Sequence, residues 1–98
     1  MATAELWWHP DAILDAEAAR DWYAERSPLA ARGFLLVLDD AVSAVLEAPG
    51  RWPEKPDGCR HYVFPSRYPF TLIYRTASRL EVVAVAHQRR KPGFWKGR

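Results

Sequence analysis

The sequence predicts a single α+β domain over residues 1–98, with the element order β-α-α-β-β-β. Two observations favour this class. A short alternating segment is followed by two segments with helical spacing of apolar residues, and then by three strand-like runs with short connections. The composition, 49% apolar and 27% charged, is typical of a folded globular domain. We therefore expect a helical hairpin on one face of a mostly antiparallel sheet of about four strands, with the other face partly open.

The first 24 residues predict a strand and then a helix. Leu6 and Trp8 alternate with Glu5 and His9, which is the two-residue period of a half-buried strand. Pro10 fits the first turn of a helix, because its missing N–H needs no partner there. The apolar stripe of this helix consists of Ala12, Ala16, Ala19 and Tyr23, with Ile13 and Trp22 beside it.

The second helix has the clearest pattern in the chain. Ser27 is a typical N-cap, and Pro28 follows at the first helical position. The wide apolar face predicts contact with two elements, the first helix and the sheet. Its central stripe is Phe34, Leu38, Ala41 and Val45, widened by Ala31, Leu35, Val42 and Leu46. The helix is expected to end at residues 48–50, which read Ala-Pro-Gly.

Three strands are expected at residues 59–64, 70–75 and 80–87. The connections at 65–69 and 76–79 are short, so neighbouring strands must run antiparallel. Residues 82–86 are apolar on both faces, which predicts an interior strand with the opening strand as its second neighbour. The side chains expected to be deeply buried include Phe34, Leu38, Val45, Ile73 and Val83.

The charges are unevenly distributed along the chain. Residues 1–58 carry five Lys and Arg against eleven Asp and Glu, whereas residues 59–98 carry nine against the single acid Glu81. The basic half predicts an anionic partner such as nucleic acid, a nucleoprotein or an acidic polypeptide. The alternative is that the two halves neutralise each other within one fold.

The sequence also indicates a compartment and excludes some chemistry. Cys59 is the only cysteine, so no internal disulfide forms and a reducing compartment is favoured. No signal peptide or membrane-spanning run is recognisable, and we expect a cytoplasmic protein without a cofactor. Cys59 and His61 could offer two metal ligands, but no second pair has zinc spacing, so no metal site is expected.

Several segments together resemble the ParE/RelE superfamily of toxins. The helical hairpin with His9-Pro10, Trp22-Tyr23 and Ser27-Pro28 is similar to that of ParE-type toxins. Residues 67–75 (RYPFTLIYR) resemble the Arg-Phe-Pro-Tyr…Tyr-Arg segment of the family. Residues 83–95 (VAVAHQRRKPGFW) resemble its closing Val-Ala-His-x-Arg-Arg-x-Pro-x-Tyr-Trp signature. These matches occur in the family's order over nearly the whole chain.

The resemblance implies the toxin of a type II toxin–antitoxin system, of the plasmid-stabilisation type, that a cognate antitoxin neutralises. ParE-like members act on DNA gyrase, and we expect this activity, which requires no catalysis. RelE-like members are ribosome-dependent endoribonucleases that cut mRNA, and this is the alternative. A third possibility is an inactive relic that still binds its antitoxin. The shared fold does not choose among these activities, so the site must.

A nuclease would need a proton-transfer group and cations near the scissile phosphate. The candidate catalytic residues are His87, Arg60 and Arg67, with His87 as the acid–base group. Alternatively, His87 only ends a strand, with a backbone carbonyl as its partner. Nucleolytic family members often have a Tyr or His near the C-terminus, whereas Phe94 and Trp95 stand here and cannot transfer a proton. This difference favours the gyrase inhibitor.

The basic and aromatic residues of the chain supply candidate contacts for the target or the antitoxin. Five tryptophans are many for a domain of this size, and exposed apolar patches usually mark partner sites. The residues we select for target or antitoxin binding are Trp22, Arg75, Arg89, Arg90 and Trp95.

Overall fold

The computed structural model describes residues 6–65 and 67–98. Its elements are β1 (Leu6–Trp8), α1 (Pro10–Ala24), α2 (Pro28–Glu47), β2 (Arg60–Val63), β3 (Phe70–Thr76) and β4 (Leu80–His87). The predicted α+β order is confirmed, and each strand boundary lies within one residue of the expected one where it falls in the described range. Of the opening strand, Glu5 and the residues before it lie outside the described residues.

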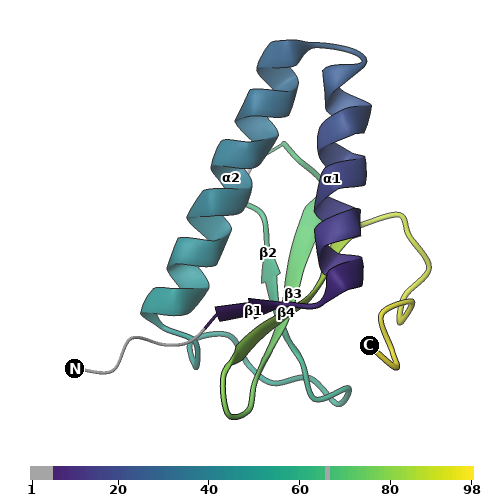
Figure 1. Ribbon diagram of the computed structural model, residues 1–98. Coiled ribbons are helices and arrows are strands. Elements are labelled where there is room, and N and C mark those ends of the chain that lie inside the picture. Colours follow the sequence, from purple (N-terminus) through teal and green to yellow (C-terminus); the bar gives the residue numbers. More distant parts are fainter. Residues whose placement is uncertain (1–5, 66) are drawn as a thin grey trace.

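The four strands form one sheet in the order β1-β4-β3-β2. β4 lies between β1 and β3, as its double-sided apolar run predicts. β2 and β4 both pair antiparallel with β3, whereas β1 pairs parallel with β4 from Leu6–Leu80 to Trp8–Val82. The helical hairpin connects β1 to the rest of the sheet and stands on one of its faces (Figure 1).

The start of α2 follows the capping residue predicted from the sequence, and α1 begins at the predicted proline with a cap that was not predicted. The Ser27 hydroxyl accepts a hydrogen bond from the Ala30 N–H at 3.3 Å, and Pro28 is the first residue of α2. His9 caps α1, because its Nδ1 accepts a hydrogen bond from the Asp11 N–H at 3.0 Å. Both helices therefore begin with an orphan backbone donor satisfied by a side chain.

The main core lies between the helical hairpin and the sheet. Phe34, Leu38 and Val45 project from α2 onto buried side chains of β3 and β4, such as Leu72 and Val82. All five side chains expected to be deeply buried are buried. Ile73 and Val83, however, face the opposite side of the sheet and belong to a second cluster.

The tail covers the middle of the opposite face of the sheet, whereas Val63 of β2 on that face is 57% exposed, so the face is partly open as expected. The second cluster consists of Cys59, Ile73, Val83, Ala84 and Ala86, and the tail side chains Phe94 and Trp95 pack against it. The tail after β4 curls back along the molecule (Figure 1). Gly93 and Gly97 have positive φ values of 82° and 90°, which allows the sharp turns of this segment.

Truncating Leu38 should test the predicted helix phase. Leu38→Ala removes buried methyl groups and leaves a cavity between α2 and the sheet, so the free energy of unfolding should fall by about 2–5 kcal/mol. Leu36→Ala is the matched control, because Leu36 lies on the same helix but is mostly exposed. Urea titration measures both, and equal losses in the two variants would contradict the described core.

Candidate functional site

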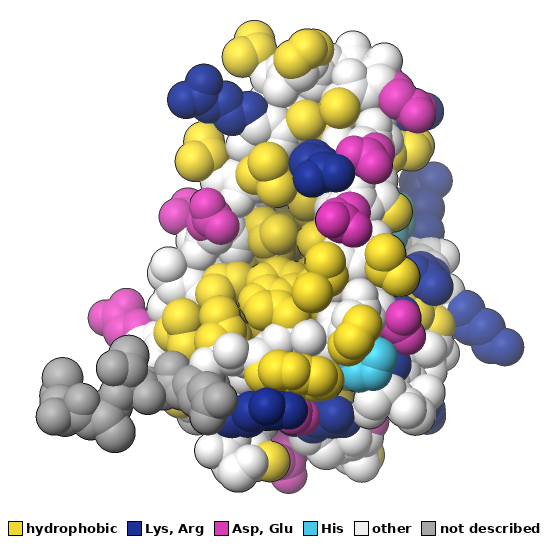
Figure 2. Space-filling view, in the orientation of Figure 1, with side chains coloured by type: hydrophobic (Ala, Val, Ile, Leu, Met, Phe, Trp, Pro, Cys, Tyr) yellow, Lys and Arg dark blue, Asp and Glu magenta, His cyan; other side chains and the backbone are white. Residues whose placement is uncertain are grey.

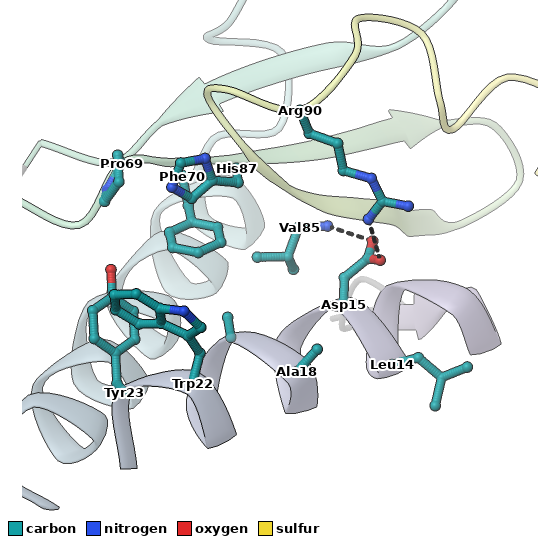
Figure 3. A pocket seen from close by; sticks show the side chains of 11 residues that line it. Leu14, Asp15, Ala18, Trp22, Tyr23, Pro69, Phe70, Val85, His87 and Arg90 are labelled. Carbon is teal, nitrogen blue, oxygen red and sulfur yellow. Dashed lines mark hydrogen bonds and ion pairs between the residues drawn. The ribbon is translucent and has the colours of Figure 1, made fainter. Parts of the chain in front are cut away.

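A large groove lies between α1, the start of β3 and the end of β4. It has a volume of about 660 Å³. One wall is the outer stripe of α1, and the other is formed by Phe70 and Val85 of the sheet, with His87 and Arg90 at the rim (Figure 3). The complete lining is Leu14, Asp15, Ala18, Ala19, Trp22, Tyr23, Pro69, Phe70, Val85, His87 and Arg90.

Trp22 is the largest exposed apolar side chain of this groove. It is 52% exposed, and its ring packs edge-on against Tyr23 at a centroid distance of 5.0 Å. The Arg26 guanidinium lies 3.5 Å from the Trp22 ring centroid and donates a hydrogen bond to the Trp22 carbonyl oxygen. The contacts with Tyr23 and Arg26 therefore fix the position of the exposed Trp22 ring and place a cation on one of its faces.

A second apolar hollow opens on the other side of α1, lined by Trp8, Ile13, Ala16 and Glu17. Figure 2 shows hydrophobic side chains gathered between the two helices and above β1, with Lys and Arg mainly at the rim. This hollow has only Glu17 as a charged lining residue, whereas the larger groove brings together acidic and basic groups. The larger groove is the candidate site for that reason.

His87 ends β4 and lies at the rim of the groove. Its ring packs edge-on against Phe70, with centroids 5.0 Å apart. Its Nδ1 accepts a hydrogen bond from the Arg89 N–H at 3.0 Å, so the ring proton of neutral His87 sits on Nε2. The partner of His87 is thus a backbone N–H, which corrects the backbone carbonyl considered from the sequence.

The three candidate nuclease residues do not form one cluster. Arg60 pairs across the ladder with Tyr74, at one end of β3, whereas His87 pairs with Phe70 at the other end. The Arg60 Nη1 donates to the Trp52 carbonyl oxygen at 2.5 Å, which holds this side chain against the loop before β2. Arg67 is exposed in the connection between β2 and β3. The structure therefore does not bring Arg60 and His87 together.

The five candidate binding residues lie on two sides of the sheet. Trp22 and Arg90 line the groove. Arg75 and Trp95 instead line a smaller cavity of about 260 Å³ between the sheet and the tail. Arg89 is exposed beside His87, to which its backbone N–H is bonded.

Arg75 and Trp95 hold the tail against the sheet. Arg75 donates to Glu81 at 2.6 Å and to the Arg98 carbonyl oxygen at 3.1 Å. The hydrogen bond from Arg75 keeps the pKa of the Glu81 carboxyl below its usual value, and Arg79 acts in the same direction. The Trp95 Nε1 donates to the Asp57 carboxylate at 3.2 Å. The contacts of Arg75 and Trp95 thus make both residues part of the structural framework.

Asp57 is an anchor for the tail in the loop before β2. Its carboxylate accepts hydrogen bonds from the Cys59 N–H at 2.9 Å and from Trp95, and it lies 3.3 Å from the His61 Nε2. The hydrogen bonds and the nearby imidazole hold the pKa of Asp57 below its usual value, although partial burial opposes them as the largest single influence.

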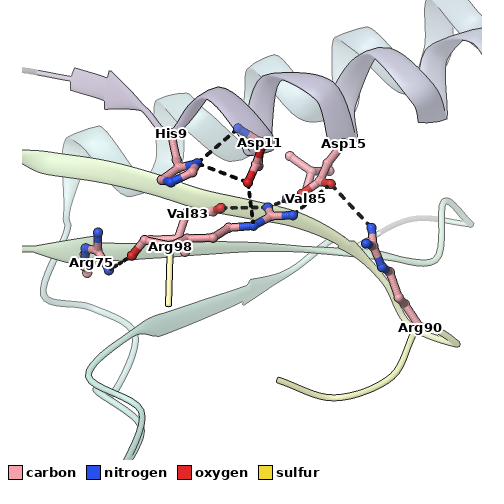
Figure 4. Close-up of polar contacts among 8 residues, drawn as sticks. All are labelled: His9, Asp11, Asp15, Arg75, Val83, Val85, Arg90 and Arg98. Atoms are coloured by element: carbon pink, nitrogen blue, oxygen red, sulfur yellow. Dashed lines mark hydrogen bonds and ion pairs between the residues drawn. The ribbon is translucent and has the colours of Figure 1, made fainter. Parts of the chain in front are cut away.

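Asp15 is the central charged residue of the site, and the sequence analysis did not select it. Its side chain is 7% exposed, although it projects from α1 toward β4. The Asp15 carboxylate accepts a hydrogen bond from the Arg98 Nη1 at 2.7 Å, and the Arg90 Nη1 lies 3.4 Å away (Figure 4). A signal was present, because position 15 follows Ala12 by three and precedes Ala19 by four, so a carboxylate falls on the buried face of α1.

Asp15 and Arg98 also form hydrogen bonds with backbone groups on the outer edge of β4. In the described part of the chain, β1 pairs with β4 only as far as Val82, and the edge beyond that residue has no strand beside it. There the Val85 N–H donates to Asp15 at 3.2 Å, and the Val83 carbonyl oxygen accepts from Arg98 at 3.0 Å. Two side chains thus take the place of a neighbouring strand and leave these backbone groups paired.

The described residues were also searched for metal sites and for membrane-spanning helices. No group of three or more His, Cys, Asp or Glu side chains could hold a metal ion within residues 6–65 and 67–98. None of the helices in the same ranges is long and apolar enough to span a membrane.

The comparisons with known proteins define first a class and then a family. The fold matches a solved structure described as a chromosomal ParDE toxin–antitoxin system from P. aeruginosa, with a TM-score of 0.73 and 20% sequence identity. The match covers 87% of this chain and 96% of the other, so most of the fold is shared. No curated protein matches the chain significantly.

The family model for the ParE toxin of the type II toxin–antitoxin system parDE matches residues 6–92. The chain therefore belongs to the ParE toxin family and is a type II toxin, as the resemblance predicted. Its class also implies a cognate antitoxin as a partner.

Removing the Asp15 carboxylate should expose the edge of β4. Asp15→Ala leaves the Arg98 guanidinium without its buried counter-ion, so the free energy of unfolding should fall by about 3–5 kcal/mol. The Val85 amide also loses its acceptor and should exchange its hydrogen faster in NMR-detected exchange. The matched control is Asp21→Ala on the same helix, where the carboxylate is exposed and pairs only with Arg20. Unchanged Val85 exchange in Asp15→Ala would contradict the described edge.

Proposed function

We propose that this toxin inhibits DNA gyrase by binding it, without catalysing a reaction. The observation that supports this best is the separation of Arg60 from His87 at opposite ends of the sheet. Cleavage of RNA needs a proton-transfer group and cations around one phosphate, and here the imidazole and that guanidinium serve different contacts. The family supports the same proposal. The action on gyrase would take place in the cytoplasm.

We also propose that the groove between α1 and the sheet binds the antitoxin. Its apolar lining suits the apolar face of an amphipathic helix, a recurring mode of peptide recognition. Trp22 would be the central anchor, because large exposed aromatic side chains contribute most to protein interfaces. Arg26 beside Trp22 and Arg90 at the rim favour an acidic edge on that helix.

Substitution of His87 separates the gyrase inhibitor from a nuclease. A gyrase inhibitor requires no proton transfer at His87, so His87→Ala should keep most of the inhibition of supercoiling by purified gyrase and most of the toxicity. A nuclease that used this imidazole would lose roughly 100-fold or more of its cleavage rate. The thermal unfolding curve of the variant shows that it is folded. Cleavage of ribosome-bound mRNA by the wild type, abolished in folded His87→Ala, would refute the gyrase proposal.

Substitution of Trp22 tests the groove as the antitoxin site. Trp22→Ala should weaken the complex with the purified cognate antitoxin by about 30-fold or more, as for a buried aromatic anchor. Leu29→Ala on α2 is the control, because Leu29 is the most exposed large apolar side chain outside the groove. Isothermal titration calorimetry measures both affinities. Equal affinity of Trp22→Ala and wild type would show that the antitoxin binds elsewhere.

A further inference from the structure

Two guanidinium groups share one buried carboxylate at the rim of the groove. Arg98 contacts Asp15 through both terminal nitrogens, at 2.7 and 3.4 Å, and the side chains of the pair are 12% and 7% exposed. Arg90 reaches the same carboxylate through one nitrogen at 3.4 Å and is 51% exposed. Asp11 adds a second carboxylate 3.8 Å from the Arg98 Nε, on the side away from Arg90.

Arg98 satisfies the charge of Asp15 without help from Arg90. The short contact is the Arg98 contact, and Arg98 also donates to the Val83 carbonyl oxygen, which fixes its side chain within the framework. The Val85 N–H also donates a hydrogen bond to the Asp15 carboxylate. Arg90 is therefore a surplus cation, because the long, exposed contact that holds it contributes little to stability.

Arg90 is nevertheless held in a defined position. Its guanidinium lies 3.7 Å from the ring centroid of Phe94, and Phe94 is itself packed on the second core cluster. In Figure 3 the side chain of Arg90 extends toward Asp15, across from Leu14 and Ala18 of α1. A planar guanidinium placed in this way can donate two parallel hydrogen bonds to a carboxylate.

We propose that Arg90 is a specificity-determining residue of the groove and pairs with a carboxylate of the antitoxin helix. On binding, the guanidinium turns from Asp15 to the antitoxin, and Asp15 keeps Arg98 as its counter-ion. The inference rests on the proposed binding of the antitoxin in this groove and names the charged contact within it. Arg89 and Lys91 add to the positive field, but neither is among the groove-lining residues.

Charge reversal at Arg90 should weaken the antitoxin complex more than reversal at the neighbouring Lys91. The purified cognate antitoxin is titrated against wild type, Arg90→Glu, Arg90→Ala and the matched control Lys91→Glu, at an exposed position outside the groove lining. We expect a loss of about 100-fold for Arg90→Glu and about 10-fold for Arg90→Ala, against less than about 5-fold for the control. At higher salt the Arg90→Glu loss should shrink only partly, because the pair lies in a groove that the antitoxin closes.

A thiol measurement controls for damage to the tail in these variants. Cys59 is the only cysteine, and it is buried in the cluster that Phe94 and Trp95 cover. A thiol-reactive dye therefore labels the protein slowly while the tail is in place. Arg90→Ala should label as slowly as wild type, which assigns its loss of affinity to the missing contact rather than to an opened tail.

Charge-swapped variants of the antitoxin provide the decisive test of the Arg90 contact. Each acidic residue on the antitoxin segment that binds the toxin is replaced by Arg, and one of these variants should restore at least 10-fold of the affinity lost in Arg90→Glu. If none does, or if Arg90→Glu binds no more weakly than Lys91→Glu, the proposal is wrong. Weak binding by Trp22→Ala together with normal binding by Arg90→Glu would leave the groove proposal standing and overturn only this one. Normal binding by Trp22→Ala would overturn both.

Discussion

The buried ion pair between Asp15 and Arg98 connects three parts of the molecule that are distant in sequence. Asp15 belongs to α1, Arg98 to the tail, and both bind backbone groups of β4. Without the Arg98 guanidinium, the nearly buried Asp15 carboxylate would keep only the longer contact with the exposed Arg90 as its ion pair, which is unfavourable. The pair thus holds the tail where Phe94 and Trp95 can cover the second face of the sheet.

The two sides of the sheet differ in how far their side chains are already engaged in contacts within the chain. On the second face, the aromatic side chains of the tail are committed to packing, and Arg75 binds the backbone of Arg98. On the groove side, Trp22 and Arg90 are half exposed and lie in a mostly apolar hollow. A toxin must recognise partners with a small domain, and the proposed antitoxin site lies on the groove side.

The sequence predicted the elements and the larger core well, because both depend on local patterns. The stripe of Phe34, Leu38 and Val45 has helical spacing, and the run of residues 82–86 is apolar on both faces. The contacts that the selected site residues make within the chain could not be predicted in this way. Arg75 and Trp95 were selected because tryptophans are many and the C-terminal half is basic, and in the structure both also hold the tail.

Local spacing by itself determined the helices, the strands and the interior position of β4, since residues near each other in sequence are sufficient for all of these. The family was predicted from the sequence through the resemblance of its motifs to those of known toxins. Only the tertiary structure decided which charged groups meet. Asp15 and Arg98 are 83 positions apart, and Arg60 and His87 share a sheet but lie at opposite ends of its ladder. The physical reason is that the folding of the tail over the sheet depends on contacts between distant side chains, and these leave no periodic signal in the sequence.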